Sequence, residues 1–546
     1  MMNTGKLAVA SILLLFLGSC TSRDQSSTDT AGIPLFDDLG THHHAVTTTN
    51  EMAQKYFDQG LRLVYGFNHE EAERAFREAA RLDPSLAMAW WGVAYALGPN
   101  YNLAIDEKRN SMALEAVRKA QSLQAGANEQ ERAYIAAIAT RYSANASAKR
   151  SDLDRTYSDA MKALYYKYPD DNDAAVLYAE SLMDLRPWQL WTNDGKPQEG
   201  TNEILGVLES VLARDQNHPG ANHYYIHAIE ASPTPEKGAP SAERLKTLVP
   251  GAGHLVHMPA HIYIRTGDYK GAVDANAHAA RVDEAYIART KADGIYPLMY
   301  YTHNFQFLSA AASMLGQSQK ALDAAAKAVS NAAPMAGHDP MAEYVLPWSL
   351  YAMARNAKWD DILNYAQPAE ATPSTVAMWR YARGIAFIAK GDLNAARKER
   401  QDFEAARKRV PTDLMLNTNR AHDLMSIAAE VFDGRLAGAD NNRKAALAHW
   451  KKAIEAQDRL VYDEPPAWYY PVRESLGGEY LLSQQYSEAE RVFREDLQIN
   501  PRNPRSLFGL GEALKAQKKD SEADQFRGQF EKEWQGSDVE ISVQTL

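Results

Sequence analysis

The sequence predicts an all-α protein, a right-handed solenoid of helical hairpins, and three observations carry this prediction. A pattern of small and aromatic residues recurs at both ends of the chain, with the period of a helix–turn–helix repeat of about 34 residues. No segment shows the strict alternation of apolar and polar residues that is typical of a half-buried strand. Glycine and proline cluster between the periodic segments and not inside them.

The first copy of the pattern ends at Pro84. Small residues let two antiparallel helices approach, Phe76 fills the groove between them, and Pro84 stops the second helix. The positions of this copy are Tyr56, Gly60, Leu63, Ala72, Phe76, Ala79 and Pro84, and those of a copy near the C-terminus are Leu476, Gly477, Tyr480, Tyr486, Ala489, Phe493 and Pro501. These positions resemble tetratricopeptide (TPR) repeats, which implies TPR-like helical hairpins, and the copies between them are weaker.

The N-terminus predicts export. Lys6 precedes the apolar run Leu7–Leu17, which is too short to span a bilayer and ends in Leu17-Gly18-Ser19-Cys20. This segment resembles a bacterial lipobox, which implies that residues 1–19 are a signal peptide and that Cys20 carries a lipid. We expect residues 20–40 to hold the lipidated cysteine and a flexible tether, because residues 21–30 are all polar.

These features predict a protein that is lipid-anchored to a bacterial membrane and faces the periplasm or the cell surface. Thr21 after the lipidated cysteine resembles sorting to the outer membrane. The net charge of −11 makes nucleic acid an unsuitable partner. Cys20 is the only cysteine, so neither a disulfide framework nor a thiolate metal site is expected. We divide the body into N-terminal repeats (41–220), central degenerate repeats (221–340) and C-terminal repeats (341–546).

Histidines concentrate in the central repeats. His223 and His227 are four residues apart, as are His257 and His261, and this spacing places each pair on one face of a helix. The repeat register puts the pairs on neighbouring helices about 10 Å apart. We therefore expect the four imidazoles to converge on one metal ion, which requires their ring nitrogens to lie within roughly 5 Å of each other. Pro259 lies inside the second pair, so that helix must begin late or kink.

Further ligands could join these four, and the candidates are His303, His69, His43, His44 and Glu230. Nitrogen ligands without a thiolate suit zinc, copper, nickel or iron. Each histidine taken alone can instead be an ordinary polar residue of the core or groove. His69 can cap a turn equally well, and the three consecutive side chains of residues 42–44 cannot all face one point.

Two inserts rich in proline and aromatic residues interrupt the repeats, at residues 186–200 and 462–470. Such segments either cover the end of a helical stack or form the rim of a ligand site, because loops on rigid scaffolds often carry binding residues. The sequence alone leaves both interpretations open.

Several segments are similar to a bacterial family of TPR lipoproteins of largely unassigned function. They are residues 53–61, 66–72, 87–92, 98–100 and the stretch His257-Met258-Pro259-Ala260-His261-Ile262-Tyr263. The resemblance implies the TPR fold from about Thr41 onward, and it implies no reaction.

Two functions follow as hypotheses. The first is a membrane-anchored scaffold or binding protein whose concave groove holds a peptide, a protein or a small ligand. The second is a metal-dependent enzyme or metal-binding protein that uses the histidine cluster. The sequence contains neither a glycine-rich phosphate loop after a strand nor a GxSxG motif, and it leaves open whether the protein is an enzyme.

Overall fold

The computed structural model describes residues 33–145, 147–338, 340–368 and 372–546, of which Leu35–Leu546 form one compact unit. The predicted signal peptide, Cys20 and most of the predicted tether lie outside the described residues. Among the described residues, no helix combines the length and the apolar character needed to cross a membrane.

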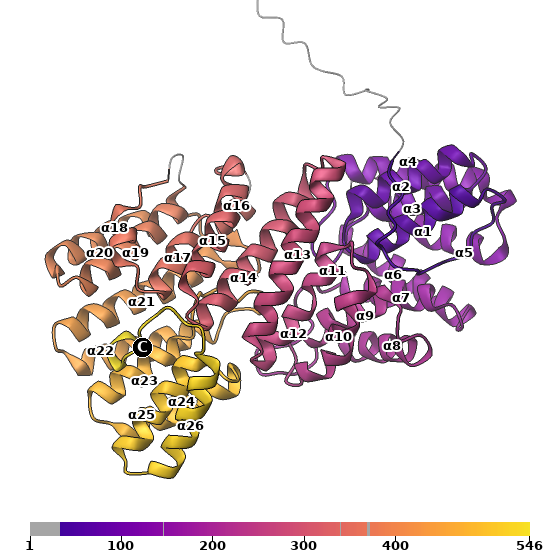
Figure 1. Cartoon of the computed structure of the whole chain (residues 1–546). Coiled ribbons are helices and arrows are strands. Elements are labelled where there is room, and N and C mark those ends of the chain that lie inside the picture. The colour runs from indigo at the N-terminus through magenta and orange to yellow at the C-terminus, as the bar shows by residue number, and fades with distance from the viewer. Residues whose placement is uncertain (1–32, 146, 339, 369–371) are drawn as a thin grey trace, which may run out of the picture. The chain divides into compact units, whose positions relative to one another are not determined.

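The prediction of an all-α fold is confirmed. Helices follow one another through the compact unit, and neighbouring helices pack in pairs such as α1 with α2, α19 with α20 and α25 with α26 (Figure 1). Within the described residues, the named strands are limited to one short antiparallel pair, β1 (Met415–Leu416) and β2 (Asn419–Arg420).

The helices have the following bounds. The first part of the unit contains α1 (Glu51–Tyr65), α2 (His69–Leu82), α3 (Ala87–Leu97), α4 (Glu107–Leu123), η1 (Gln124–Gly126), α5 (Glu129–Ala139), α6 (Arg150–Lys167), α7 (Asn172–Met183) and α8 (Thr201–Arg214). The central part contains α9 (Pro219–Ile229), η2 (Pro235–Gly238), α10 (Ala239–Leu248), α11 (Gly253–His257), α12 (Pro259–Thr266), α13 (Tyr269–Thr290), η3 (Tyr296–Tyr301), α14 (Thr302–Met314), α15 (Ser318–Ala332) and η4 (Ala333–Met335). The last part contains α16 (Pro340–Val345), α17 (Trp348–Arg355), α18 (Trp359–Asn364), α19 (Pro373–Ala389), α20 (Leu393–Arg407), α21 (Ala421–Ala439), α22 (Arg443–Gln457), α23 (Val472–Leu482), α24 (Tyr486–Ile499), α25 (Pro504–Ala516), α26 (Asp520–Glu533) and η5 (Val543–Thr545).

The first hairpin, α1–α2, shows why the repeat pattern folds as it does. The Asn68 side chain accepts a hydrogen bond from the backbone of Glu71 and caps α2. The Phe76 ring is fully buried between α1 and α3, so close that a Cβ at Gly60 or Gly92 would lie 2.6 or 2.4 Å from it. A larger residue at either glycine would therefore have to displace the ring.

The same packing returns near the C-terminus. Phe493 on α24 is fully buried, and a Cβ at Gly477 or Gly509 would lie 2.4 or 2.2 Å from its ring. The glycine and phenylalanine positions that the sequence pattern singles out thus have the same role at both ends. The ring packs directly on the glycine of the neighbouring helix, which lets the two helices of each hairpin approach closely.

The central helices depart from this regular pattern. α11 ends at His257 and α12 begins at Pro259, so the proline stands in the first turn of a new helix, where its missing N–H costs nothing. The prediction that the second histidine pair shares one helix is wrong, whereas the expected interruption at Pro259 is confirmed. After α13 the chain forms η3, a π-helix, which is a rare element that often occurs at functional sites.

Candidate metal centre

Six buried or nearly buried histidines gather where α9, α11, α12 and α14 meet. They come from four helices and form two groups in which the ligand atoms lie within 4.8 Å of one another. The groups are His223, His227 and His254, which we call the first triad, and His257, His261 and His303, which we call the second triad. A third, overlapping group of His227, Glu230 and His261 connects them.

The first triad joins two helices. The ring centroid of His223 on α9 lies 4.9 Å from that of His227 and 5.0 Å from that of His254 on α11. All three side chains are at most 2% exposed. The Nε2 atoms of His223 and His227 and both ring nitrogens of His254 make no hydrogen bond among the described residues, although all are buried. A buried polar atom without a partner is costly, so this arrangement calls for an explanation.

The second triad is packed more tightly. Nε2 of His257 lies 2.7 Å from Nε2 of His261, and the His303 ring lies 4.9 Å from that of His257. The rings of the two triads also contact each other, with centroid distances of 5.2 Å from His227 to His261 and 5.6 Å from His254 to His257. The two triads are therefore immediate neighbours.

Hydrogen bonds to Nδ1 fix which nitrogen of each ring carries the proton. Nδ1 of His223 lies 2.6 Å from the backbone carbonyl of Tyr65, which can only accept, so Nδ1 donates. Nδ1 of His257 lies 2.6 Å from Oδ1 of Asn276, whose Nδ2 donates to the carbonyl of Ala272 at 2.7 Å. That second bond fixes the amide orientation, so Nδ1 of His257 is also the donor. In their neutral forms both rings keep the lone pair on Nε2.

Two glutamate side chains contact the other rings, Glu230 both His227 and His261 and Glu464 only His261. Oε1 of Glu230 accepts from Nδ1 of His227 at 2.9 Å, and Oε2 of Glu230 accepts from Nδ1 of His261. Oε2 of Glu464 also lies 2.6 Å from Nδ1 of His261. An acceptor behind Nδ1 that leaves Nε2 free, as at His227, is the arrangement in which metal-binding histidines are usually oriented.

Burial sets the charge state of most of these rings. It lowers the pKa values of His223, His254 and His257 well below the ordinary 6.5, and neighbouring imidazoles lower them further. These rings are therefore neutral at pH 7. Burial also lowers the pKa of His261, but Glu230 and Glu464 outweigh it and raise the value to about 10. Without a metal ion, the His261 Nε2 proton thus occupies the 2.7 Å gap to His257.

The two carboxyl groups beside His261 differ from each other. Burial raises the pKa of Glu230, but the charges of His261 and His227 outweigh it and lower the value to about 2. Burial and the charge of Glu230 raise the pKa of Glu464 to about 8. One firmly ionised carboxylate and one carboxyl group that holds its proton therefore flank the same imidazole.

The centre opens onto a cavity of about 490 Å³. His227, His254, His261, His303 and Glu464 contribute to its lining, together with the aromatic side chains of Tyr101, Trp188 and Tyr300. The Trp188 ring stacks on Tyr101 with centroids 5.3 Å apart, and Tyr300 on η3 lies 4.8 Å from His254. A molecule in this cavity would contact both triads.

Both inserts reach this cavity. Trp188 lies in the first insert, has a positive φ of 62° and donates its indole N–H to Asn102. Glu464 comes from the second insert, whose later residues instead pack in the core, where Tyr469 stacks on Tyr351. The second insert thus lines the cavity at Glu464 and packs in the core farther along, and its role at a ligand site stays a prediction.

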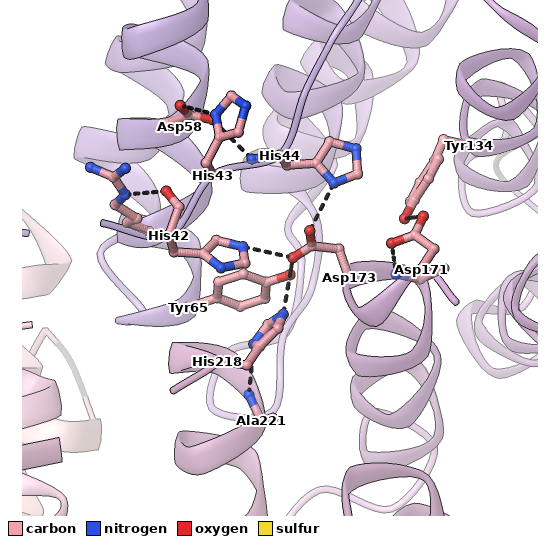
Figure 2. Close-up of polar contacts among 12 residues, drawn as sticks. His42, His43, His44, Asp58, Tyr65, Tyr134, Asp171, Asp173, His218 and Ala221 are labelled. Atoms are coloured by element: carbon pink, nitrogen blue, oxygen red, sulfur yellow. Dashed lines mark hydrogen bonds and ion pairs between the residues drawn. The ribbon is translucent and has the colours of Figure 1, made fainter. Parts of the chain in front are cut away.

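A second cluster of histidines surrounds Asp173 at the start of α7 (Figure 2). Oδ1 of Asp173 lies 2.9 Å from Nε2 of His42 and 3.1 Å from Nε2 of His218, and it accepts from the Tyr65 hydroxyl at 2.5 Å. Oδ2 lies 2.7 Å from Nδ1 of His44. The ligand atoms of His42, Asp173 and His218 lie within 4.8 Å of one another, as do those of His44, Asp171 and Asp173.

The hydrogen bonds of this second cluster argue against a metal ion there. Nδ1 of His218 accepts from the backbone N–H of Ala221 at 3.2 Å, so it holds the lone pair and Nε2 holds the proton. Nε2 then donates to Asp173 and cannot bind a cation. The carboxylate itself already accepts from Tyr65 and from the histidines around it, so the cluster is a complete hydrogen-bond network (Figure 2).

The structure thus separates the residues that the sequence suggested. His223, His227, His257 and His261 lie together with Glu230 and His303, but they divide into two triads and do not form one group of four. His43 and His44 lie at Asp58 and Asp173. His69 stacks on Phe67, and burial followed by the charge of Arg109 lowers its pKa to about 3.

Two residues of the centre escaped the sequence reasoning. His254 lies three residues before His257, a spacing that the sequence analysis did not use. Glu464 lies more than 200 residues after His261, which it contacts, and its only signal was its place in an unusual insert.

No family model and no curated protein matches the sequence significantly. Among solved structures, the human IFIT1 dimer with m7Gppp-AAAA is similar, with a TM-score of 0.34, 13% identity and coverage of 82% of this chain and 90% of that chain. Yeast Tom70 has a TM-score of 0.34 and 11% identity, covering 88% of this chain and 97% of its own. The APC/C hetero-tetramer Cut9–Hcn1 has a TM-score of 0.34 and 15% identity, covering 85% and 76%. Because these TM-scores and identities are low, nothing about the function of this chain follows from them.

Proposed function

We propose that this chain is a transition-metal-binding protein whose ion is held by His223, His227 and His254 in the wall of the cavity. The observation that carries the proposal is the set of unpartnered ring nitrogens in this triad, all buried and within 4.8 Å of one another. Three neutral imidazoles with inward lone pairs suit Zn²⁺, Cu²⁺, Ni²⁺ or Fe²⁺.

The surroundings of the triad support this proposal over a purely structural role. The Tyr65 carbonyl and the Glu230 carboxylate accept from Nδ1 of His223 and His227, which orients each Nε2 toward the centre. A structural role would leave these buried nitrogens without partners, at a cost of about 1–3 kcal/mol each. A bound cation removes that cost for one nitrogen of each of the three rings.

The cavity indicates what such an ion would do. His227 and His254 form part of the cavity wall, so an ion held by three protein nitrogens could take a further ligand from the cavity side. Tyr101 and Trp188 add a stacked aromatic surface beside it. We propose that the helical repeats serve as a scaffold that holds a small ligand against the metal. The binding-protein hypothesis and the metal-binding hypothesis would then describe the same site.

The proposal is tested by elemental analysis of the purified full chain without a histidine tag. We expect a stoichiometric transition metal, and loss of that metal in the variant His254→Ala with the helical circular dichroism spectrum unchanged. His278 belongs to the same sequence cluster but is exposed, so His278→Ala is the matched control and should keep the metal. Less than about a tenth of an equivalent in the unmodified chain, unresponsive to added Zn²⁺, would exclude the function.

Membrane anchoring through Cys20 is a separate proposal, supported by the lipobox-like segment Leu17-Gly18-Ser19-Cys20. We expect Cys20→Ala to move the protein from the membrane fraction of the producing bacterium to the soluble fraction. Retention of the variant in the membrane would contradict it.

A further inference from the structure

The ion of the proposed function is held by the first triad and contacts none of the three histidines of the second triad. We propose that His257, His261 and His303 bind a second transition-metal ion, so the centre holds two ions side by side. This inference rests on the proposed function, because it adds a second ion to the same centre. The class of ion is the same, a divalent first-row metal with a preference for nitrogen ligands.

The first argument is the approach of two ring nitrogens. Nε2 of His257 and Nε2 of His261 lie 2.7 Å apart and point at each other. Nδ1 of His257 is committed as a donor to Asn276, so Nε2 of His257 is an acceptor. Nδ1 of His261 faces carboxyl groups, so Nε2 is the nitrogen of His261 that can bind an ion. A transition-metal ion bonded to both Nε2 atoms at about 2.0–2.1 Å would replace the proton in this gap and lie beside the line that joins them.

The second argument is that the triad has its own third ligand and its own opening. The His303 ring lies 4.9 Å from the ring of His257 and 5.9 Å from that of His261, and it comes from α14, which contributes nothing to the first triad. His261 and His303 form part of the cavity wall, as do His227 and His254 of the first triad. Each ion would thus face the same cavity.

The third argument is charge. Two divalent cations in a buried site need nearby negative charge, because an uncompensated buried ion is expensive. Glu230 contacts one histidine of each triad, and Glu464 contacts the same Nδ1 atom of His261 that Glu230 does. Both side chains are buried, and no lysine or arginine is paired with either one among the described ion pairs. Glu230 therefore provides a negative charge that the two ions would share.

The experiment is a titration of the metal-free, untagged full chain with Co²⁺, followed by visible absorption of nitrogen-coordinated cobalt and by equilibrium dialysis. We expect two bound equivalents in the unmodified chain. The variant His303→Ala should keep one equivalent, that of the first triad, and His254→Ala should keep the equivalent of the second triad. Asp173→Asn should not change the two equivalents, which excludes binding at the Asp173 cluster.

The outcomes separate the two proposals. Two equivalents that each triad variant reduces to one support the two-ion centre. One equivalent in the unmodified chain, lost with His254→Ala and kept with His303→Ala, overturns the second ion and leaves the proposed function intact. No bound cobalt overturns both. If a variant unfolds, the more conservative His303→Gln or His254→Gln replaces it, and the same stoichiometries apply.

Discussion

The two histidine clusters of this chain use the same side chain in opposite ways. At Asp173, protons on the imidazoles point at a carboxylate, and the nitrogens of His218 are both committed to hydrogen bonds. In the central cluster, the acceptors lie behind Nδ1, and the Nε2 atoms of His223 and His227 have no partner. Proximity of histidines alone therefore does not distinguish a metal site from a structural network. The position of the protons does.

Tyr65 connects the two clusters. Its hydroxyl donates to Asp173, and its backbone carbonyl accepts from His223. α9 also belongs to both, because His218 caps its first turn and His223 and His227 project from its later turns. The Asp173 network and the first triad are thus neighbours that share Tyr65 and α9. The predictions below test whether one cluster serves stability and the other serves metal binding.

The largest effect is expected on stability from Asp173→Asn. This change leaves His42, His44, His218 and Tyr65 without their shared buried carboxylate, and breaking such a network costs about 3–5 kcal/mol. Urea denaturation should show this loss, with bound metal per folded molecule unchanged. The exposed Asp170→Asn is the control and should change stability by less than about 0.5 kcal/mol. If the variant is as stable as the parent chain, the network does not have the structural role proposed for it.

The pH dependence of stability should show the His44 contribution. Burial lowers the pKa of this ring, but the hydrogen bond and charge of Asp173, with the charges of Asp171 and Asp58, raise it to about 9 from 6.5. A folded-state pKa above the unfolded value stabilises the fold fully below pH 6.5, and this stabilisation is lost as the pH rises to about 9. The loss amounts to about 3 kcal/mol at 1.36 kcal/mol per pKa unit.

Urea denaturation of the metal-free chain at pH 6 and pH 9 measures this loss, and His44→Gln should show a smaller difference between the two values. An equal difference in the variant would assign the pH dependence to other groups.

Glu230→Gln should weaken metal binding about 10- to 100-fold, because acceptors behind ligand histidines tune affinity by that amount. The carboxylate of Glu230 contacts Nδ1 of His227 and of His261, so the amide would disturb the orientation and basicity of both rings. Competition with a chelator measures the change in affinity. Glu236 on η2 is exposed, so Glu236→Gln is the matched control, and equal affinities for both variants would show that Glu230 does not act on the centre.

The smallest effect is expected from His43→Ala. The side chain is 56% exposed and pairs with Asp58 at 2.8 Å, a type of contact that contributes about 1 kcal/mol or less. Neither stability nor metal content should change appreciably. A loss of metal in this variant would return residue 43 to the set of candidate ligands.

The sequence predicts the fold and part of the site for physical reasons that can be named. Gly60 and Phe76 pack against each other within one hairpin, so the sequence pattern predicts their contact without knowledge of the rest of the fold. His223 and His227 lie on one helix, as their spacing predicts, because α9 is regular. His257 and His261 lie close together as predicted but on two helices, because Pro259 divides the expected helix in two.

The rest of the site depends on contacts that no local pattern contains. The Tyr65 carbonyl and Oδ1 of Asn276 decide which nitrogen of His223 and His257 is protonated, and both come from other helices. Glu464 reaches His261 from an insert more than 200 residues away in the sequence. Residue type and spacing therefore predict that imidazoles gather, whereas only the packed structure separates a hydrogen-bond network from a candidate metal centre.

The most direct test of this distinction is a crystal of the metal-loaded chain measured at the absorption edge of the bound metal. We predict anomalous density among His223, His227, His254, His257, His261 and His303, at bond lengths near 2.0–2.1 Å for a zinc ion. We predict no such density within bonding distance of Asp173, His42 or His218. Density at the Asp173 cluster, or none among the central histidines, would contradict the account.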